Sequence, residues 1–317
     1  MKKLHFVFLS FSLILLTSFS TQIIDNISKE TLIHEGLERT YFLHIPKNYD
    51  VTKGYPLVIG LHGGGGKAKK FNRSTKGRFN ELSDEEGFII VYPQGIDKSW
   101  NDHNERNSYG EARQKNINDV GFIEALIEKL EEDYNLDSNY IFACGISNGG
   151  LMSATLATRL HPRIKAIGMV SSNFSKAHFK EMKETNPEPF PIIIIQGTED
   201  PIFPYNEGEI ALFKQKRGEI IGAEKSISFM LSLNGNTTEG SETQLPNNAP
   251  FDQCKSVLIE YSNQANPNLK VSFIKVFGGG HTWPGGIQYL PKGIIGKVTR
   301  DFNAADQLWE FFKSTME

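Results

Sequence analysis

The stretch "CGISNGG", Cys144–Gly150, places one serine among three glycines, between an apolar run and a helical pattern. The run that leads into it, "NYIFACG" (139–145), is short and apolar, as expected of a buried strand. A chain that turns from strand to helix within a couple of residues crowds its own backbone, and glycines at 145 and 149 relieve that crowding. Such a turn exposes Ser147 at the carboxyl edge of a sheet, beside the unpaired N–H groups of a helix N-terminus. In this context the G-x-S-x-G spacing is typical of a nucleophile elbow. A tight glycine turn with a capping serine is the alternative.

Short apolar runs rich in β-branched residues recur along the rest of the chain. They lie at 55–61, 87–93, 139–145, 164–172, 190–197 and 271–279, and predict strands buried on both faces. Helical patterns lie at 118–134, 148–160, 224–233 and 303–313. Strands that alternate with helices predict an α/β fold, a mostly parallel central sheet with helices on both faces. The segment 30–48 would add antiparallel strands at the start, and the polar stretch 234–252 predicts a loop.

The composition is that of a globular protein without a nucleic-acid partner. The 317 residues are 39% hydrophobic and 22% charged, enough to bury one sizeable core. The 34 basic and 37 acidic side chains give a net charge of -3, and Lys and Arg form no cluster beyond short pairs. Binding to nucleic acid or to an anionic membrane is therefore not expected, and a small or neutral substrate is favoured.

Residues 1–20 have the organisation of a secretory signal peptide. Lys2 and Lys3 precede an apolar run from about Leu4 to Leu16, and small residues follow it, which suits cleavage before Thr21. The alternatives are a membrane anchor or a buried helix, but the run is shorter than the roughly 20 residues that span a bilayer. We expect a secreted or periplasmic protein with no membrane contact after cleavage, in which residues 21–317 form a single catalytic domain.

The two cysteines, Cys144 and Cys254, would be permitted to pair in an exported protein. Cys144 ends an apolar run three residues before the serine, a position typical of a packed side chain, so we do not expect this disulfide. No Cys/His spacing resembles a zinc site, and no metal is expected.

A serine hydroxyl is a weak nucleophile at neutral pH, so the elbow requires a general base and a group that orients it. Where this motif occurs, the acid and the histidine follow the serine in chain order. "IIIIQGTEDP" ends a strand with Glu199 and Asp200, and "VFGGGHTWPGG" ends the last strand with His281. We predict Asp200 as the orienting acid, with Glu199 as the alternative, and His281 as the base. Taken singly, Asp200 could be a turn residue and His281 a structural loop histidine.

Ester or amide hydrolysis also requires donors for the oxyanion of the tetrahedral intermediate, each worth about 10²–10³ in rate. One donor should be the backbone N–H of Asn148, directly after the serine. The other should come from "LHGGGG" (61–66), where glycines allow the backbone to approach the substrate. Gly64 is the predicted donor, to within one residue. The run could instead cradle a phosphate, but no phosphate-binding motif is completed around it.

Taken together, "PLVIGLHGGGG", "GISNGGLMSATLA", "GTEDPIFPY" and "GGGHTWPGG" resemble the secreted polyhydroxybutyrate depolymerase-like esterases, which are related to the feruloyl and acetylxylan esterases of carbohydrate esterase family one. The resemblance spans about residues 35–310. It implies an α/β-hydrolase fold that works without a cofactor, with Ser147, Asp200 and His281 as the catalytic triad. It also implies that Trp100 of "SWND" and Trp283 of "HTWPG" line the substrate cleft.

The chain departs from the family pattern at several positions. Gln196 and Phe203 replace a histidine and a valine that family members usually carry around the acid, and neither change touches the triad. Asn236 stands where relatives often have a cysteine, so a disulfide seen in some relatives is not expected. No polymer-binding domain follows the catalytic region, which disfavours action on insoluble polyester.

These observations predict a secreted serine carboxylesterase that acts through an acyl-enzyme. Its expected substrates are feruloyl or acetyl esters on plant polysaccharide, and the alternative is a hydrolase of poly(3-hydroxybutyrate)-type polyesters or their oligomers. A serine peptidase of the same fold and a non-catalytic binding protein with the hydrolase fold are more remote alternatives.

Overall fold

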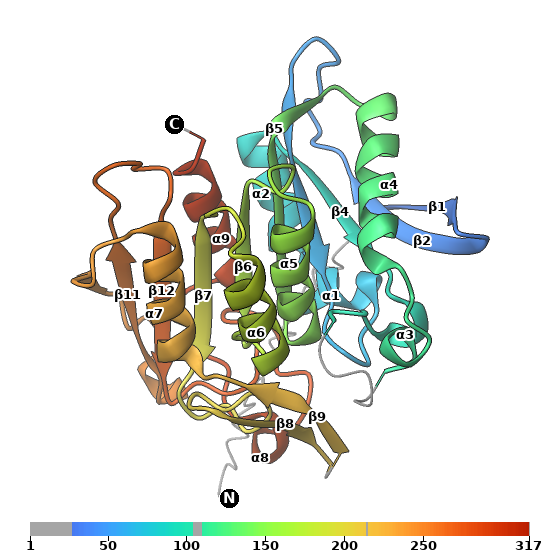
Figure 1. The fold of residues 1–317 in the computed structure, drawn as a ribbon. Helices are drawn as coiled ribbons and strands as arrows, with labels where there is room; N and C mark the ends of the chain where they lie inside the picture. Colours follow the sequence, from blue (N-terminus) through green and yellow to red (C-terminus); the bar gives the residue numbers. More distant parts are fainter. Residues whose placement is uncertain (1–26, 104–109, 214, 317) are drawn as a thin grey trace, which may run out of the picture.

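A ten-stranded sheet forms the centre of the molecule in the computed structural model, which describes residues 27–103, 110–213 and 215–316 (Figure 1). Across the sheet the strands follow the order β1 (Ser28–His34), β2 (Leu37–His44), β4 (Ile89–Pro93), β3 (Tyr55–Leu61), β5 (Leu136–Ile146), β6 (Ala166–Val170), β7 (Ile192–Gly197), β12 (Val271–Phe277), β11 (Lys255–Tyr261) and β10 (Ser241–Gln244). The predicted signal peptide, residues 1–20, lies outside the described residues. Within them, no helix combines the length and the apolar character needed to cross a membrane.

The six strands from β4 to β12 in this order pair in parallel, and antiparallel strands complete both edges. Parallel strands place their carboxyl ends at the same edge of the sheet. Ser147, Asp200 and His281 each follow the carboxyl end of one of these strands, namely β5, β7 and β12. The topology therefore brings the predicted triad to one edge.

Helices cover both faces of the sheet, as predicted. One face packs against α4 (Asp119–Asp133), α5 (Asn148–Arg159), α6 (Lys176–Thr185) and α7 (Ala223–Asn234), which lie in front of the sheet in Figure 1. The other face packs against α1 (Ala68–Ser74), α2 (Arg78–Glu86) and α9 (Ala304–Lys313). Within β3, Leu57 and Ile59 belong to the first core cluster and Val58 to the second. This alternation explains why the strand reads as continuously apolar.

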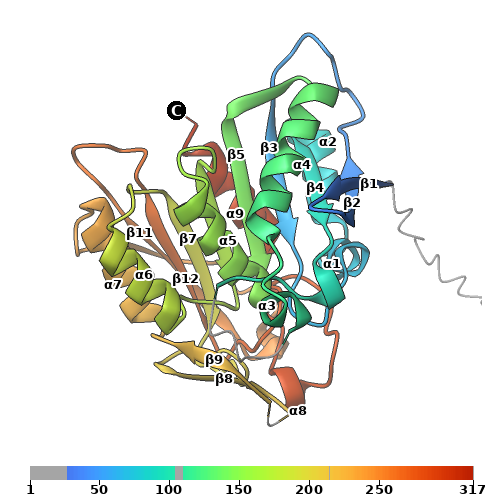
Figure 2. The same ribbon diagram turned by 45° about the vertical axis from the view of Figure 1, so that its right-hand side comes forward.

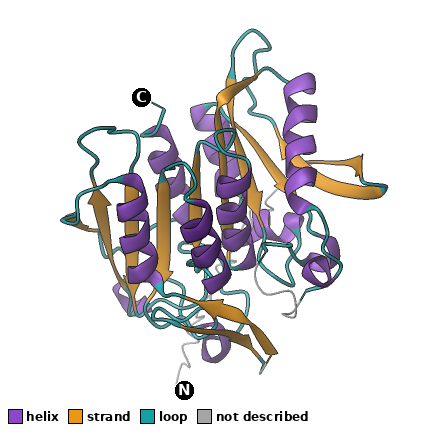
Figure 3. Ribbon diagram, in the orientation of Figure 1, coloured by secondary structure: helices purple, strands orange, loops and turns teal. Residues whose placement is uncertain are grey.

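Short elements surround the carboxyl edge of the sheet. They are α3 (Glu111–Gln114), α8 (Lys292–Ile295), two 3₁₀ turns (Ile96–Lys98 and Pro250–Asp252), and a separate hairpin of β8 (Gly208–Leu212) and β9 (Gln215–Ile220). Figure 2 shows the hairpin below the ends of the central strands, and Figure 3 shows that loops occupy much of the same region. No sequence pattern indicated this hairpin.

The predicted loop 234–252 needs correction. It contains the strand β10, which pairs antiparallel with β11 at the edge of the sheet. All four residues of β10 are exposed. Because neither face of this strand is buried, it has no apolar pattern that could have revealed it.

Gly168 in β6 leaves room for α9. A Cβ atom at this position would collide with Leu308 Cδ2 and lie 3.3 Å from Cys144 Cβ. We expect Gly168→Ala to destabilise the protein by about 1–3 kcal/mol, the usual cost of overpacking a filled core. The double variant Gly168→Ala/Leu308→Ala should cost less than the sum of the two single changes, because the collision is removed.

Denaturant unfolding of these variants measures the effect. Gly293→Ala serves as the control, because a Cβ atom there has no neighbour within 4 Å. Equal losses of stability in Gly168→Ala and Gly293→Ala would contradict the close packing of α9 on β6.

Candidate active site

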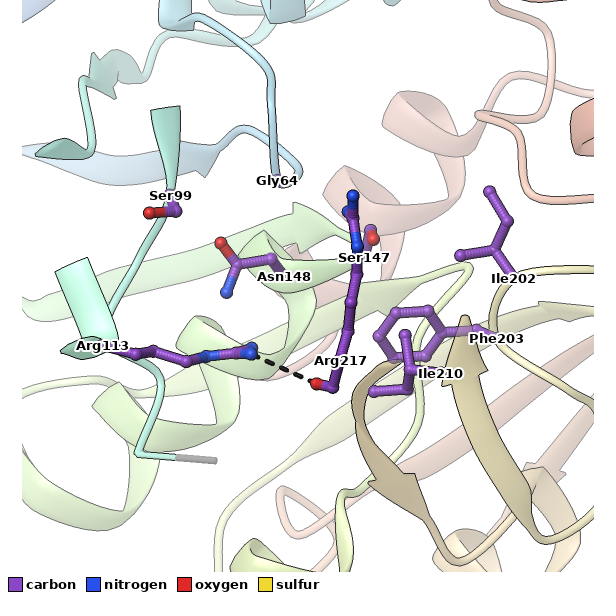
Figure 4. A pocket seen from close by; sticks show the side chains of 9 residues that line it. All are labelled: Gly64, Ser99, Arg113, Ser147, Asn148, Ile202, Phe203, Ile210 and Arg217. Atoms are coloured by element: carbon purple, nitrogen blue, oxygen red, sulfur yellow. Dashed lines mark hydrogen bonds between the residues drawn. The ribbon is translucent and has the colours of Figure 1, made fainter. Parts of the chain in front are cut away.

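Ser147 lies at the sharp turn between β5 and α5. Its backbone has φ 60° and ψ -123°, a conformation that a non-glycine residue rarely adopts and that clusters at functional sites. Side chains at Gly145 and Gly149 would each collide with the carbonyl oxygen of Leu61, at the end of β3. The two glycines are therefore required by the close approach of the turn to the neighbouring strand. The Ser147 side chain faces a pocket (Figure 4).

Asp200 and His281 form a buried hydrogen-bonded pair. His281 Nδ1 lies 2.9 Å from Asp200 Oδ2, and the two residues are 4% and 6% exposed. The other carboxylate oxygen accepts the backbone N–H groups of Ile202 at 2.9 Å and Phe203 at 2.8 Å. These bonds fix the carboxylate, which then selects the imidazole tautomer with the proton on Nδ1 and leaves Nε2 as the acceptor. This is the arrangement that a general base requires.

Glu199, the alternative acid, has a different position. Its side chain is 61% exposed and faces Lys297 Nζ at 3.5 Å. Gln196, one of the departures from the family pattern, lies next to the Asp200–His281 pair instead. Its Nε2 donates to Asp200 Oδ2 at 3.3 Å and to the carbonyl of Phe203 at 3.0 Å.

The loop that carries His281 is fastened close to Ser147. Ser171 Oγ donates to the carbonyl of Thr282 at 2.9 Å and accepts its N–H at 3.2 Å. The preceding residue, Val170, accepts the N–H of Ser147 at 3.0 Å. The Phe203 ring stacks on His281, with ring centroids 5.6 Å apart, and lines the same pocket as Ser147.

No hydrogen bond links Ser147 to His281 in the part of the chain that the structure describes. In many enzymes such a bond shortens only in the complex with substrate. The complete triad accordingly remains a prediction, whereas its Asp200–His281 half is formed.

The pocket in front of Ser147 has an apolar and a polar side. It is lined by Gly64, Ser99, Arg113, Ser147, Asn148, Ile202, Phe203, Ile210 and Arg217. In Figure 4 Ile202, Phe203 and Ile210 lie on one side of Ser147, and Ser99, Asn148 and Arg113 lie on the other. Gly64 and Asn148, the predicted oxyanion donors, both line it.

The glycine loop after β3 has only some of its amides available. The N–H of Gly65 donates to the carbonyl of Lys98 at 2.8 Å, and that of Gly66 donates to Gly63 at 2.9 Å. These two amides are used inside the protein, which favours Gly64 or its neighbour Gly63 as the donor. A Cβ atom at Gly64 would lie 3.7 Å from Asn148 Cβ, so the two candidate donors are adjacent.

His62 holds this loop in place. Its Nε2 accepts the N–H of Gly95 at 3.0 Å, and its Nδ1 donates to the carbonyl of Gly63 at 2.9 Å. Burial lowers the pKa of His62 to about 4. The imidazole is therefore neutral near pH 7, as its acceptor role toward Gly95 requires.

Asn148 is held by a buried polar network whose other members were not among the predicted site residues. Its Oδ1 accepts the N–H of Trp100 at 2.8 Å, and its Nδ2 donates to Asp102 Oδ2 at 2.7 Å. Asp102 in turn accepts two hydrogen bonds from Arg113, at 2.6 and 2.5 Å. Asp102 and Asp119 are both buried, with 0% and 1% exposure. The clustering of polar residues in "SWND" was the available signal.

Trp100 and Trp283 are not brought to the pocket. They are 0% and 2% exposed. Trp100 Nε1 donates to the carbonyl of His62 at 2.9 Å, which braces the glycine loop from behind. Trp283 packs edge-on against Phe71 and Phe79, with centroids 5.2 and 5.9 Å apart. Both indoles thus contribute to packing in this structure and offer no face to a ligand.

The described residues contain no group of three or more His, Cys, Asp or Glu side chains that could hold a metal ion. Cys144 and Cys254 are both buried and free. Burial raises the pKa of the Cys144 thiol above its usual range.

Known proteins resemble this chain in sequence and in fold. The sequence profile of the family described as Esterase PHB depolymerase matches residues 39–183, which include Ser147 and the glycine loop. A protein of Aspergillus terreus named "Probable feruloyl esterase C" is 28% identical over 277 residues, which cover 86% of this chain and 83% of that protein. NocK of Nocardia uniformis subsp. tsuyamanensis, named as a candidate esterase, is 27% identical over 285 residues, which cover 87% and 79%. The chain is a carboxylic ester hydrolase.

The fold of this esterase has a solved counterpart. The acetyl xylan esterase from Aspergillus awamori aligns with a TM-score of 0.57 and 14% identity, covering 90% of this chain and 99% of that one. The match confirms the predicted α/β-hydrolase fold. The resemblance to the polyhydroxybutyrate depolymerase-like and feruloyl esterases is confirmed by the sequence matches.

Acid should destabilise the esterase through two buried histidines, His62 and His178. Burial lowers the pKa of each to about 4, against about 6.5 in an unfolded chain. Each therefore contributes fully to stability above about pH 6.5, and this contribution is lost as the pH falls toward 4, because the unfolded chain takes up the proton first. We expect a loss on the order of 3 kcal/mol per histidine between pH 7 and pH 4.

Urea unfolding across this pH range measures the loss. His62→Gln should be less stable than wild type at pH 7 but should show only about half of the wild-type loss on acidification, because His178 remains. Gly293→Ala, which removes no titratable group, is the control and should keep the wild-type response. An unchanged acid response in His62→Gln would contradict the assigned neutral state of His62.

Proposed function

We propose that this protein is a secreted serine carboxylesterase that hydrolyses its substrate through an acyl-enzyme, with feruloyl or acetyl esters of plant polysaccharide as the favoured substrates. The observation that carries the proposal is the buried Asp200–His281 hydrogen bond of 2.9 Å beside a pocket lined by Ser147 on a strained turn. A nucleophile, a base with a free Nε2 and an orienting carboxylate are the parts that acyl transfer requires.

In the proposed mechanism His281 Nε2 takes the proton of Ser147 as the Oγ attacks the ester carbon. Asp200 keeps the imidazole in the tautomer with Nδ1 protonated and stabilises the cation that forms. The developing oxyanion accepts hydrogen bonds from the backbone N–H groups of Asn148 and Gly64. His281 then gives its proton to the leaving alcohol, activates a water molecule, and returns a proton to Ser147 as the acid is released.

The substrate class is supported by the names of relatives and by the shape of the pocket. A feruloyl esterase name accompanies the Aspergillus terreus relative, and an acetyl xylan esterase shares the fold. The apolar side, formed by Ile202, Phe203 and Ile210, suits an acyl group or a short alkyl chain. The family profile supports the alternative substrate, a poly(3-hydroxybutyrate)-type oligomer. Secretion is supported by the signal-peptide pattern of residues 1–20.

Replacing Ser147 by alanine should abolish turnover without unfolding the protein. We expect kcat/KM for 4-nitrophenyl acetate to fall roughly 10⁴-fold or more, as for loss of other triad nucleophiles. Asp200→Asn should lower it by about 10⁴-fold through the wrong histidine tautomer. A fluorophosphonate probe should label wild type and not Ser147→Ala.

Ser228→Ala is the matched control for this prediction, because Ser228 is exposed on α7. It should keep both labelling and activity. Undiminished ester hydrolysis in Ser147→Ala would disprove the serine mechanism.

A substrate panel tests the acyl and alcohol specificity. We expect methyl ferulate and acetylated xylan to give higher kcat/KM values than short 3-hydroxybutyrate oligomers. Release of ferulate, acetate and hydroxybutyrate can be measured by chromatography under identical conditions. Exclusive hydrolysis of the oligomers would reverse the order proposed here.

A further inference from the structure

The β8–β9 hairpin carries a cation into the pocket in front of Ser147. Arg217 and Ile210, which come from opposite strands of the hairpin, both line that pocket. Figure 4 shows the Arg217 side chain extending toward Ser147, between the apolar and polar sides. A Cβ atom at Gly64, the candidate oxyanion donor, would lie 3.7 Å from Arg217 Nη1. The guanidinium is thus close to the position where the ester must bind.

A β-bulge directs this side chain. Glu209 pairs with Glu219 and Ala211 pairs with Lys216, so Ile210 alone faces both Arg217 and Gly218. Gly218 has φ 113°, in a region that only glycine adopts readily. Bulges re-aim side chains and are over-represented next to active sites. The bulge at Arg217 and Gly218 therefore directs the Arg217 side chain toward the pocket.

The hairpin is firmly attached to the rest of the molecule. Ile210 and Ile220 are 2% and 0% exposed, and the N–H of Ala211 donates to the carbonyl of Ile202 at 3.2 Å. On the other strand, Arg113 Nη1 donates to the carbonyl of Arg217 at 3.2 Å, the bond drawn in Figure 4. The backbone that carries Arg217 is therefore held in place.

The bond from Arg113 connects the hairpin to the candidate oxyanion site. Arg113 also binds Asp102 through two hydrogen bonds, and Asp102 accepts from the side chain of Asn148 at 2.7 Å. One buried network therefore fixes both the hairpin and the residue after the serine. Within it the Arg113 guanidinium binds Asp102, and Arg217, whose Nη2 donates to Gln215 Oε1 at 3.3 Å, is half-buried and lines the pocket.

We propose that Arg217 is a specificity-determining residue, and that the esterase prefers substrates with a carboxylate a few bonds from the ester group. This inference rests on the proposed esterase function and concerns the choice between esters that differ only by a nearby carboxylate, not the ranking of ferulate, acetate and hydroxybutyrate esters. Arginine binds carboxylates through two parallel N–H···O bonds, and partial burial beside Ile210 and Phe203 strengthens such a pair relative to one in water. The apolar side of the pocket would take the hydrocarbon part of the same substrate.

Two matched pairs of esters test the proposal. Monomethyl succinate and dimethyl succinate differ by a carboxylate on the acyl part, and 3-acetoxybutyrate and its methyl ester differ by one on the alcohol part. Methanol release is measured for the first pair and acetate release for the second. For at least one pair, wild type should have the higher kcat/KM on the anionic member, and added salt should reduce this preference.

Arg217→Gln should lower kcat/KM for the preferred anionic ester by about tenfold to a hundredfold, the usual range for a lost hydrogen-bonded charge, and change that of its neutral partner by no more than about twofold. Arg217→Lys should retain part of the preference. The control is Arg300→Gln, which removes the same charge from an exposed position and should change neither value.

The remaining outcomes overturn the proposal in distinguishable ways. An equal loss on anionic and neutral esters in Arg217→Gln would assign Arg217 to oxyanion stabilisation or to folding, and a melting curve would separate the two. A wild type without any preference for the carboxylate would contradict the Arg217 subsite alone. A wild type that hydrolyses none of the four esters would contradict the proposed function as well.

Discussion

The contact between the β5–α5 turn and the end of β3 is the constraint on which the site depends. The carbonyl of Leu61 lies where side chains at positions 145 and 149 would have to be, so the two segments can meet only through glycine. This contact brings Ser147 next to the glycine loop, whose first glycine, Gly63, lies two residues after Leu61. This one contact therefore positions both the candidate nucleophile and the candidate oxyanion donors. The backbone of Ser147 is strained as a consequence, and the surrounding sheet supplies the rigidity that maintains the strain.

Buried polar groups fix the remaining parts of the site. His62 supports the glycine loop from one side through Gly95 and Gly63, and Trp100 supports it through the carbonyl of His62. The Asp102–Arg113 pair holds Asn148 and the hairpin from the other side. Each of these groups is hydrogen-bonded, as burial requires. A site assembled in this way can present preorganised donors to a developing charge without reorganising during the reaction.

The sequence predicted the fold and the paired residues of the site because these features follow from local patterns. Continuous apolar runs indicated the parallel strands. Asp200 and His281 follow two of these runs, and because parallel strands end at the same edge of the sheet, the two residues were expected to lie close together there. The direction of a side chain does not follow from such patterns. Trp100 and Trp283 therefore read as exposed aromatic surfaces, whereas both point into the interior. The β8–β9 hairpin was missed because its structure depends on the packing of Ile210 and Ile220 on the core, and not on a regular pattern of charged and apolar residues.

The polar edge strand β10 has a consequence for the solution behaviour of the molecule. An outer strand presents unpaired backbone groups that can recruit the sheet of another molecule. In β10 the four side chains are Ser241, Glu242, Thr243 and Gln244, all of them exposed and polar. Because β10 offers no apolar side chain to bury, another sheet would gain little stability by pairing with this edge. The strand therefore terminates the sheet in a way that opposes its extension into aggregates.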